Sequence, residues 1–296
     1  MKYAYSATLL CLLLFFSCRP KKAPAKTDAA AAMARELPPE LHTDLYGNWV
    51  GDFVSISGEE PDYEDVARIN IRLTRITAEG AEGRSVVKGN DRPMKGALTV
   101  AGNKYSFIMD EPGSDRHDGR FEFSIAGDTL RGRWKAYKAT GVKNPVKEFV
   151  LVKKPFRYNA NLMLPEDWEY VDYENGHTQT ELYTNEDGTV DSSINKVYRS
   201  ASDEVYKLNG SAEELTEKQL KNLKKLDLEI IRNTIFARHG YSFKSKGVRQ
   251  FFDQVEWYVP VTNSVEGVLT GVEQKNVALL KRFEKYAQDN YDTFGR

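Results

Sequence analysis

The sequence predicts an α+β protein: an antiparallel β-barrel or sandwich of about eight strands, a β-ribbon connector, and a small all-α C-terminal module. Two observations support this. From Leu45 to Phe156 apolar and polar residues alternate with a period of two, and glycine, asparagine and aspartate recur between the runs. From Ser211 onward the apolar period becomes helical. With 296 residues the chain is long enough for two ordinary domains.

The expected β-domain covers residues 43–156. Its short alternating runs are 46–53, 69–74, 85–88, 95–100, 105–109, 120–125, 129–137 and 148–152. Turn residues stand between them, at 81–83 and 89–91 among other places. The residues expected to point inward are bulky, so we expect a filled interior rather than a cup: Ile69, Ile71, Leu73, Phe121, Phe123 and Ile125.

A polar loop, Glu111–Gly119, has aspartates on both sides of His117. These residue types could hold a divalent cation, but a loop that connects two strands needs no ligand, and we favour the second interpretation. Residues 157–210 are expected to form the β-ribbon connector. Its strands are predicted at 168–173, 179–184 and 190–198, and Asn185–Gly188 forms the turn between the last two.

The helical module is expected at residues 211–290. Its central helix starts at Leu228, where Asp227 can cap the first amides, and ends before Gly240, which can adopt the left-handed conformation. Leu228, Ile231 and Ile235 form its apolar stripe. Two capping boxes, Thr216 with Gln219 and Thr270 with Glu273, predict the starts of two more helices, and residues 245–254 suggest another.

The N-terminus combines Lys2 with a short apolar run, Ala7–Phe16, followed by Ser17 and Cys18. This pattern resembles a bacterial lipoprotein signal peptide. The resemblance implies that residues 1–17 are removed and that Cys18 carries the lipid, with residues 18–42 as a flexible tether. The alternative is a plain secretory signal that is cut near Ala23 or Ala25.

Cysteine usage and charge agree with an exported protein. Cys11 lies in the segment that would be removed, so the mature chain has one thiol and no internal disulfide. Basic residues (42) nearly balance acidic residues (43), so we expect no nucleic-acid partner. We expect the outer membrane of a Gram-negative bacterium as location, with the protein facing the periplasm.

Two further stretches resemble known families. The string Arg232-Asn233-Thr234-Ile235-Phe236-Ala237-Arg238-His239-Gly240-Tyr241, together with Trp257-Tyr258-Val259-Pro260 and Asn276–Leu280, resembles a YARHG domain over roughly Leu215–Tyr286. Phe236 stands where that family has tyrosine. The resemblance implies an extracytoplasmic bacterial module without an established activity. The triplet Gly47-Asn48-Trp49 resembles the start of lipocalin-like barrels.

The motif residues have a structural and a binding interpretation. Arg238 and His239 could bind an anion, but they lie at a helix C-terminus, whereas anions prefer N-termini. We expect Arg238 to donate hydrogen bonds to open carbonyls and His239 to pack under the Gly240 turn. Trp257 and Tyr258 are expected in the core. The candidate site therefore has these residues, structural or binding: Arg232, Asn233, Phe236, Ala237, Arg238, His239, Gly240, Trp257 and Tyr258.

Three functions remain open from the sequence. The first is a non-enzymatic envelope lipoprotein that binds an envelope protein or cell-wall glycan. The second is a carrier of a small apolar ligand in the β-barrel. The third, a hydrolase of envelope polymers, lacks support because the four histidines are scattered and no nucleophile, metal or phosphate-loop motif is present. We therefore predict no catalytic residues, no metal and no cofactor.

Overall fold

The computed structural model describes residues 37–57, 60–113 and 117–289. The expected signal peptide, Cys18 and most of the tether lie outside the described residues. From Pro38 onward the chain belongs to one compact unit, which contains both the β-domain and the helical module.

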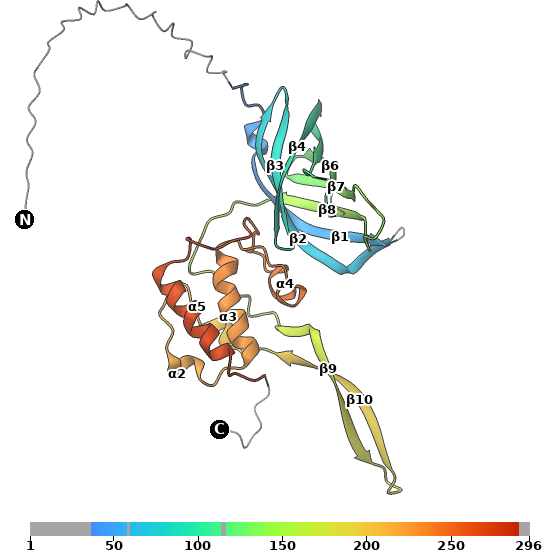
Figure 1. Cartoon of the computed structure of the whole chain (residues 1–296). Coiled ribbons are helices and arrows are strands. Elements are labelled where there is room, and N and C mark those ends of the chain that lie inside the picture. The colour runs from blue at the N-terminus through green and yellow to red at the C-terminus, as the bar shows by residue number, and fades with distance from the viewer. Residues whose placement is uncertain (1–36, 58–59, 114–116, 290–296) are drawn as a thin grey trace, which may run out of the picture. The chain divides into compact units, whose positions relative to one another are not determined.

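The alternating region forms a closed barrel of eight antiparallel strands, in which β1 pairs with both β2 and β8 (Figure 1). The strands are β1 (Gly47–Ser57), β2 (Glu60–Thr77), β3 (Gly80–Val87), β4 (Asn90–Ala101), β5 (Lys104–Asp110), β6 (Gly119–Ala126), β7 (Thr129–Ala136) and β8 (Val146–Lys153). Of the two expected architectures, barrel and sandwich, the structure has the barrel.

Aromatic side chains fill the middle of the barrel. The rings of Phe107 and Phe123 stack with their centroids 4.9 Å apart, and Phe149 lies 5.8 Å from Phe121 and 6.0 Å from Phe53. All six residues expected to point inward are at most 5 % exposed. A filled interior of this kind stabilises the barrel by burial and ring contacts.

Trp49 is buried in the barrel core. Its side chain is 1 % exposed, and its indole N–H donates to the carbonyl oxygen of Leu45 at 3.0 Å. Leu45 itself ends a short 3-10 helix, η1 (Thr43–Leu45), and is buried in the same core. Trp49 is therefore a core aromatic residue of the barrel.

One expected turn lies inside a strand instead, and a second is displaced by one residue. Residues 81–83 belong to β3 and Asn90 begins β4. Gly83 is a packing glycine, because a Cβ there would come within 2.7 Å of the carbonyl oxygen of Arg72 on β2. The chain reverses at Lys88 and Gly89, which both have positive φ (51° and 78°). Glycine alone therefore did not distinguish a turn from a close approach of two strands.

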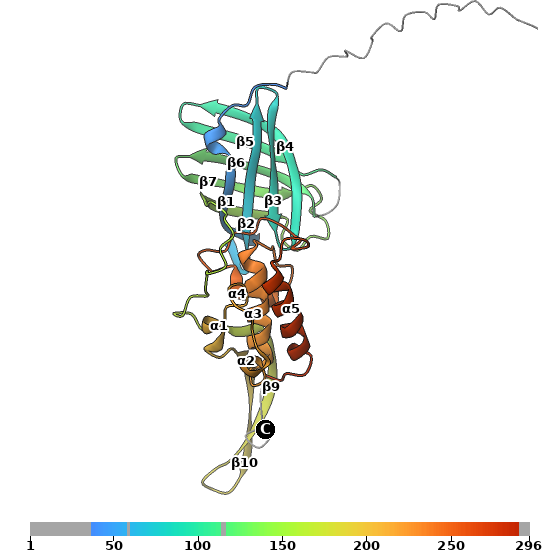
Figure 2. The same ribbon diagram turned by 90° about the vertical axis from the view of Figure 1, so that its left-hand side faces the viewer.

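The ribbon and the helices follow in the expected order. The strands β9 (Val171–Thr184) and β10 (Val190–Ser200) pair as a two-stranded sheet. The helices are α1 (Glu204–Lys207), α2 (Glu217–Leu220), α3 (Lys225–Arg238), α4 (Lys246–Phe252) and α5 (Gly271–Glu284), and α3 lies beside α5 (Figure 2). Both predicted capping boxes are present. Helix α1 was not predicted, and β9 begins three residues later than expected.

The start of the central helix differs from the prediction. Helix α3 begins at Lys225, so Asp227 lies within its first turn, where it accepts a hydrogen bond from the amide of Lys224 at 3.0 Å. The first exposed amides are satisfied by a distant residue instead: Asp289 accepts from the amide of Leu226 at 2.8 Å. The C-terminal prediction is confirmed, since Gly240 has a φ of 71°.

The helical module bonds to the outer face of β1 and β2. Asn70 is 0 % exposed although it points away from the barrel interior, and its amide nitrogen donates to the carbonyl oxygen of Pro260 at 2.8 Å. Arg68 donates to the carbonyl oxygens of Val255 and Tyr258. In return, Arg249 of α4 donates to the carbonyl oxygen of Val66 at 3.3 Å. These bonds link segments that are almost two hundred residues apart in the sequence.

Candidate functional site

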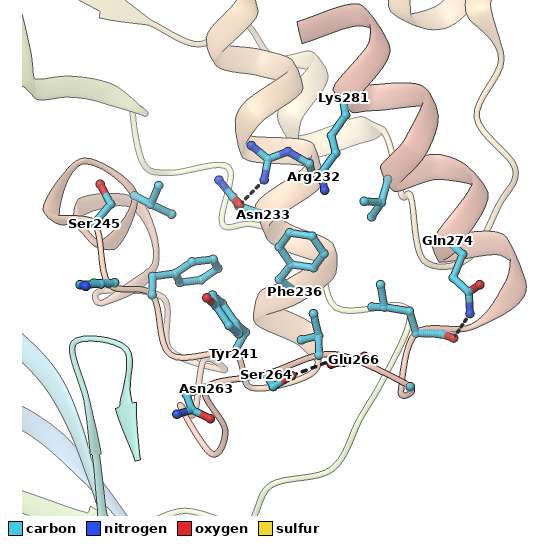
Figure 3. Close-up of a pocket in the computed structure, with 17 residues that line it drawn as sticks. Arg232, Asn233, Phe236, Tyr241, Ser245, Asn263, Ser264, Glu266, Gln274 and Lys281 are labelled. Atoms are coloured by element: carbon cyan, nitrogen blue, oxygen red, sulfur yellow. Dashed lines mark hydrogen bonds between the residues drawn. The ribbon is translucent and has the colours of Figure 1, made fainter. Parts of the chain in front are cut away.

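A groove in the helical module is the candidate site, and we call it the α3–α5 groove. It has a volume of about 920 Å³ and lies between α3, α5 and the loops that flank α4 (Figure 3). Its lining residues are Arg232, Asn233, Phe236, Tyr241, Phe243, Lys244, Ser245, Val248, Asn263, Ser264, Val265, Glu266, Gly267, Leu269, Gln274, Val277 and Lys281. Three of the nine candidate site residues, Arg232, Asn233 and Phe236, therefore reach this surface.

The wall of the groove is aromatic and aliphatic. The half-buried ring of Phe236 meets Tyr241 edge-on at 6.1 Å, and Tyr241 meets Phe243 edge-on at 5.2 Å. Leu269 and Val277 lie on the α5 side of the same surface. Half-buried rings of this kind leave apolar area in contact with water, and covering that area favours binding.

The charges around the groove are not all neutralised. Arg232 is held by Glu284 through two hydrogen bonds, of 2.5 and 3.0 Å, and it also donates to Asn233 at 3.0 Å. Lys244 and Lys281 are exposed, and neither forms an ion pair with any described residue. The rim therefore keeps two free cationic groups above an apolar wall.

Arg238 points away from this groove into the protein. It is 1 % exposed and donates to the carbonyl oxygen of Leu162 at 2.7 Å and to the hydroxyl of Ser211 at 3.0 Å. Burial lowers the pKa of its guanidinium to about 10, and the nearby Glu273 carboxylate opposes this shift, so the side chain stays charged at neutral pH. Contrary to the expectation, its acceptors are Leu162 of the connector and Ser211 at the start of the helical module, and not carbonyls at the end of its own helix.

His239 also contacts other residues of the protein and does not line the groove. Its Nε2 lies 2.7 Å from Glu273, which is 0 % exposed, and its ring stacks on Tyr158 at 4.4 Å. The hydroxyl of Tyr158 donates to the other Glu273 oxygen at 3.1 Å. Burial raises the pKa of Glu273. Hydrogen bonds from Ser211, Thr270 and His239 lower this pKa by more than burial raises it, so the pKa lies below its ordinary value.

The two aromatic residues after α4 donate hydrogen bonds to carbonyl oxygens of the protein. Tyr258 is 1 % exposed, and its hydroxyl donates to the carbonyl oxygen of Tyr241 at 2.6 Å. Trp257 donates through its indole nitrogen to the carbonyl oxygen of Met163 at 2.8 Å. Arg238 and Trp257 thus fasten consecutive residues of the connector, Leu162 and Met163, to the helical module.

The structure therefore divides the expected site. Arg232, Asn233 and Phe236 line the α3–α5 groove, whereas Ala237, Arg238 and Trp257 line a separate cavity of about 560 Å³. His239, Gly240 and Tyr258 line neither of these two surfaces.

Sequence reasoning missed the other participants. Lys244 and Lys281 carried no signal, because exposed lysines are common. Tyr158 lies far from the motif in the sequence. Glu273 was expected only as part of a capping box, and it fills that role as well, accepting from the amide of Thr270 at 2.9 Å.

In the polar loop of the barrel, the carboxylate of Glu111 accepts hydrogen bonds from other barrel residues. Burial raises the pKa of Glu111, whose oxygens accept from Ser85 at 2.8 Å, from the amide of Gly119 at 3.0 Å and from Trp134 at 3.2 Å. Within the described ranges no group of three or more histidine, cysteine, aspartate or glutamate residues could hold a metal ion. Of the helices in these ranges, none is sufficiently long and apolar to span a membrane.

Comparison with known proteins identifies one part of the chain. The family model of the YARHG domain matches residues 204–285. The match begins at α1 and includes the whole of α5, so it contains the α3–α5 groove. Neither a curated protein nor a solved structure matches the chain. Residues 204–285, which follow an eight-stranded barrel, are a YARHG domain.

Proposed function

We propose that this protein is a non-enzymatic interaction protein of the bacterial cell envelope, which binds an extended segment of a partner protein in the α3–α5 groove. A YARHG domain is consistent with an extracellular or periplasmic protein-interaction module. The observation that carries the proposal is the groove itself, with an aromatic wall beneath Lys244 and Lys281. An apolar side chain fits that wall, and an acidic side chain beside it pairs with the lysines.

The groove is suited to a chain segment more than to a small reactant. Its volume of about 920 Å³ lies at the upper end of the range for small-molecule pockets, and exposed loop residues such as Asn263, Ser264 and Glu266 form one side. Arg232, a half-buried cation of the wall, is neutralised by Glu284 and is not free to act on a substrate. Binding is therefore the simpler use of this surface.

The proposal includes a lipid anchor on Cys18 in the outer membrane, with the protein facing the periplasm. The support is the apolar run that ends at Ser17-Cys18, together with the absence of any other cysteine after Cys11. A lipidated N-terminal cysteine carries more than one acyl chain, which is enough for stable attachment. Residues 19–41, rich in alanine, proline and lysine, would then serve as the tether.

We expect the Cys18→Ala variant to lose its membrane attachment, because the substitution removes the only atom that can carry the lipid. The measurement is metabolic labelling with a fatty acid, followed by fractionation of soluble and membrane proteins. Cys11→Ala is the matched control and should change neither readout. Labelling that persists in Cys18→Ala, or a wild-type chain without label, would contradict the anchor.

Photocrosslinking tests the groove. We expect a benzophenone side chain in place of Gln274, which lines the groove, to give one dominant protein adduct in living cells. The same group in place of Ala278, an exposed position of α5 outside the groove, is the control and should give none. Lys281→Glu should reduce the Gln274 adduct by about tenfold, since it reverses a charge that faces the partner. Equal adducts at both positions would argue against the groove, and a glycan adduct would replace the protein partner with cell-wall glycan.

The carrier alternative finds less support. A barrel that carries a small ligand needs interior space, but here rings from β1, β5, β6 and β8 meet across the interior at centroid distances of 4.9–6.4 Å. We therefore assign the barrel the role of a rigid support.

A further inference from the structure

A second hollow of the protein has a different chemistry from the groove. It has a volume of about 910 Å³, and we call it the β2–α4 cavity. Most of its lining residues are charged or carry amides: Asp52, Val66, Arg68, Tyr173, Glu174, Lys196, Lys246, Arg249, Gln250, Asp253 and Gln254. These residues come from the first two barrel strands, the ribbon and the α4 region, all within one compact unit.

Two arginines of this cavity have donors without acceptors. Arg249 is 6 % exposed, and Arg68 is half-buried. The Nε atom of each is fully buried and has no hydrogen-bond partner among the described residues. Their bonded atoms are the Nη1 groups, which reach the carbonyl oxygens of Val255, Tyr258 and Val66 and the Asp253 carboxylate. The Nε atoms are too deeply buried for a ligand to reach. Neither Nη2 group donates to a described residue, and neither is fully buried, so each arginine keeps a donor for an added acceptor.

Of the charged residues that line the cavity, two cations and one anion form no ion pair with a described residue. Lys246 pairs with Glu174 at 2.8 Å, and Arg249 pairs with Asp253 at 3.1 Å. Arg68 and Lys196 have no carboxylate partner among the described residues. Asp52 is directly opposite Arg68 in the β1–β2 ladder, yet it forms no ion pair there either.

Asp253, which lines the cavity, has a side chain that is 20 % exposed. Burial raises the pKa of Asp253 to about 6, although Arg249 and Arg68 both act to lower it. Charged hydrogen bonds are stronger where water is scarce, so an anion that reaches the arginines gains more there than at the open surface.

We propose that the β2–α4 cavity binds a short peptide by its two free ends: the terminal carboxylate accepts from Arg68 and Arg249, and the terminal ammonium lies beside Asp52. A carboxylate supplies the missing acceptor for the guanidinium groups. The close neighbourhood of Asp52 and Arg68 offers both signs of charge, which suits a zwitterion better than a simple anion. The amides of Gln250 and Gln254 and the volume of about 910 Å³ suit the peptide groups between the two ends.

Calorimetric titration of the full-length chain in detergent micelles with tri-alanine tests this. We expect saturable binding that weakens by about tenfold or more when the peptide carries a C-terminal amide, and likewise when its amino group is acetylated. Asp52→Asn should abolish the difference between free and acetylated peptide. Lys196→Gln should weaken binding of the free peptide, while Lys275→Gln, at an exposed lysine on α5, should leave it unchanged.

Each variant is compared after its melting curve shows that it folds. Asp52 and Lys196 are exposed, so we expect their substitution to leave the fold intact. Absence of heat with tri-alanine on the wild-type chain would overturn the proposal. So would equal affinity for the C-terminal amide. Inorganic phosphate that binds as tightly as the peptide would overturn it too, because it would make the cavity a general anion site.

Discussion

The Phe121→Ala variant is expected to lose about 4 kcal/mol of its free energy of unfolding, because a large core ring is removed and the cavity cannot fully collapse. Phe121 is 1 % exposed and lies between the rings of Phe53 and Phe149, at 6.4 and 5.8 Å. Both neighbours stand on other strands, so a backbone that is closed into a barrel cannot move to fill the gap. Chemical denaturation followed by near-ultraviolet circular dichroism measures the loss.

The neighbouring residue supplies the control. Glu122 follows Phe121 on β6 and is exposed, so Glu122→Ala should change the free energy of unfolding by less than about 0.5 kcal/mol. A small effect of Phe121→Ala, similar to that of Glu122→Ala, would mean that the barrel is not filled as described. The carrier function would then regain its physical basis.

Arg238→Ala is expected to destabilise the protein by about 3 kcal/mol, because it leaves buried acceptors without a donor. The substitution removes hydrogen bonds of 2.7 Å to the Leu162 carbonyl and 3.0 Å to the Ser211 hydroxyl. It also removes the positive charge that stands near the buried Glu273 carboxylate. A lower melting temperature is the readout.

Two comparisons separate packing from charge at this position. Arg238→Met keeps the apolar stem and should recover part of the loss. Arg157→Ala, at an exposed arginine on the rim of the same cavity, should leave the melting temperature unchanged. An unaltered melting curve for Arg238→Ala would refute the structural role and would point to ligand binding by Arg238 instead.

Local pattern was sufficient for most of the fold. Alternation placed Ile69, Ile71 and Leu73 inside the barrel, and two capping boxes marked the starts of α2 and α5. These features depend on residues that are near neighbours in the sequence, where period and hydrogen-bonding chemistry leave few choices. The YARHG resemblance is confirmed over residues 204–285.

Hydrogen bonds between residues far apart in the sequence could not be predicted from local patterns. Asp289 caps α3 from a position more than sixty residues away, and Tyr158 binds Glu273 across more than one hundred residues. Gly83 looked like a turn, because a glycine that lets two strands approach has the same local sequence as one that turns the chain. The two lysines of the groove rim acquire meaning only when the fold places them beside the rings of Phe236 and Tyr241.

The hydrogen bond from Asn70 to Pro260 has a consequence for the order of events during folding. All eight barrel strands are complete at Lys153, but the segment that covers β1 and β2 arrives more than one hundred residues later. Until then Val50 and Asn70, which are opposite each other in the ladder and at most 1 % exposed in the finished protein, face the surroundings. A chain that ends before α4 would therefore leave Val50 and Asn70 exposed on the outer surface of the barrel.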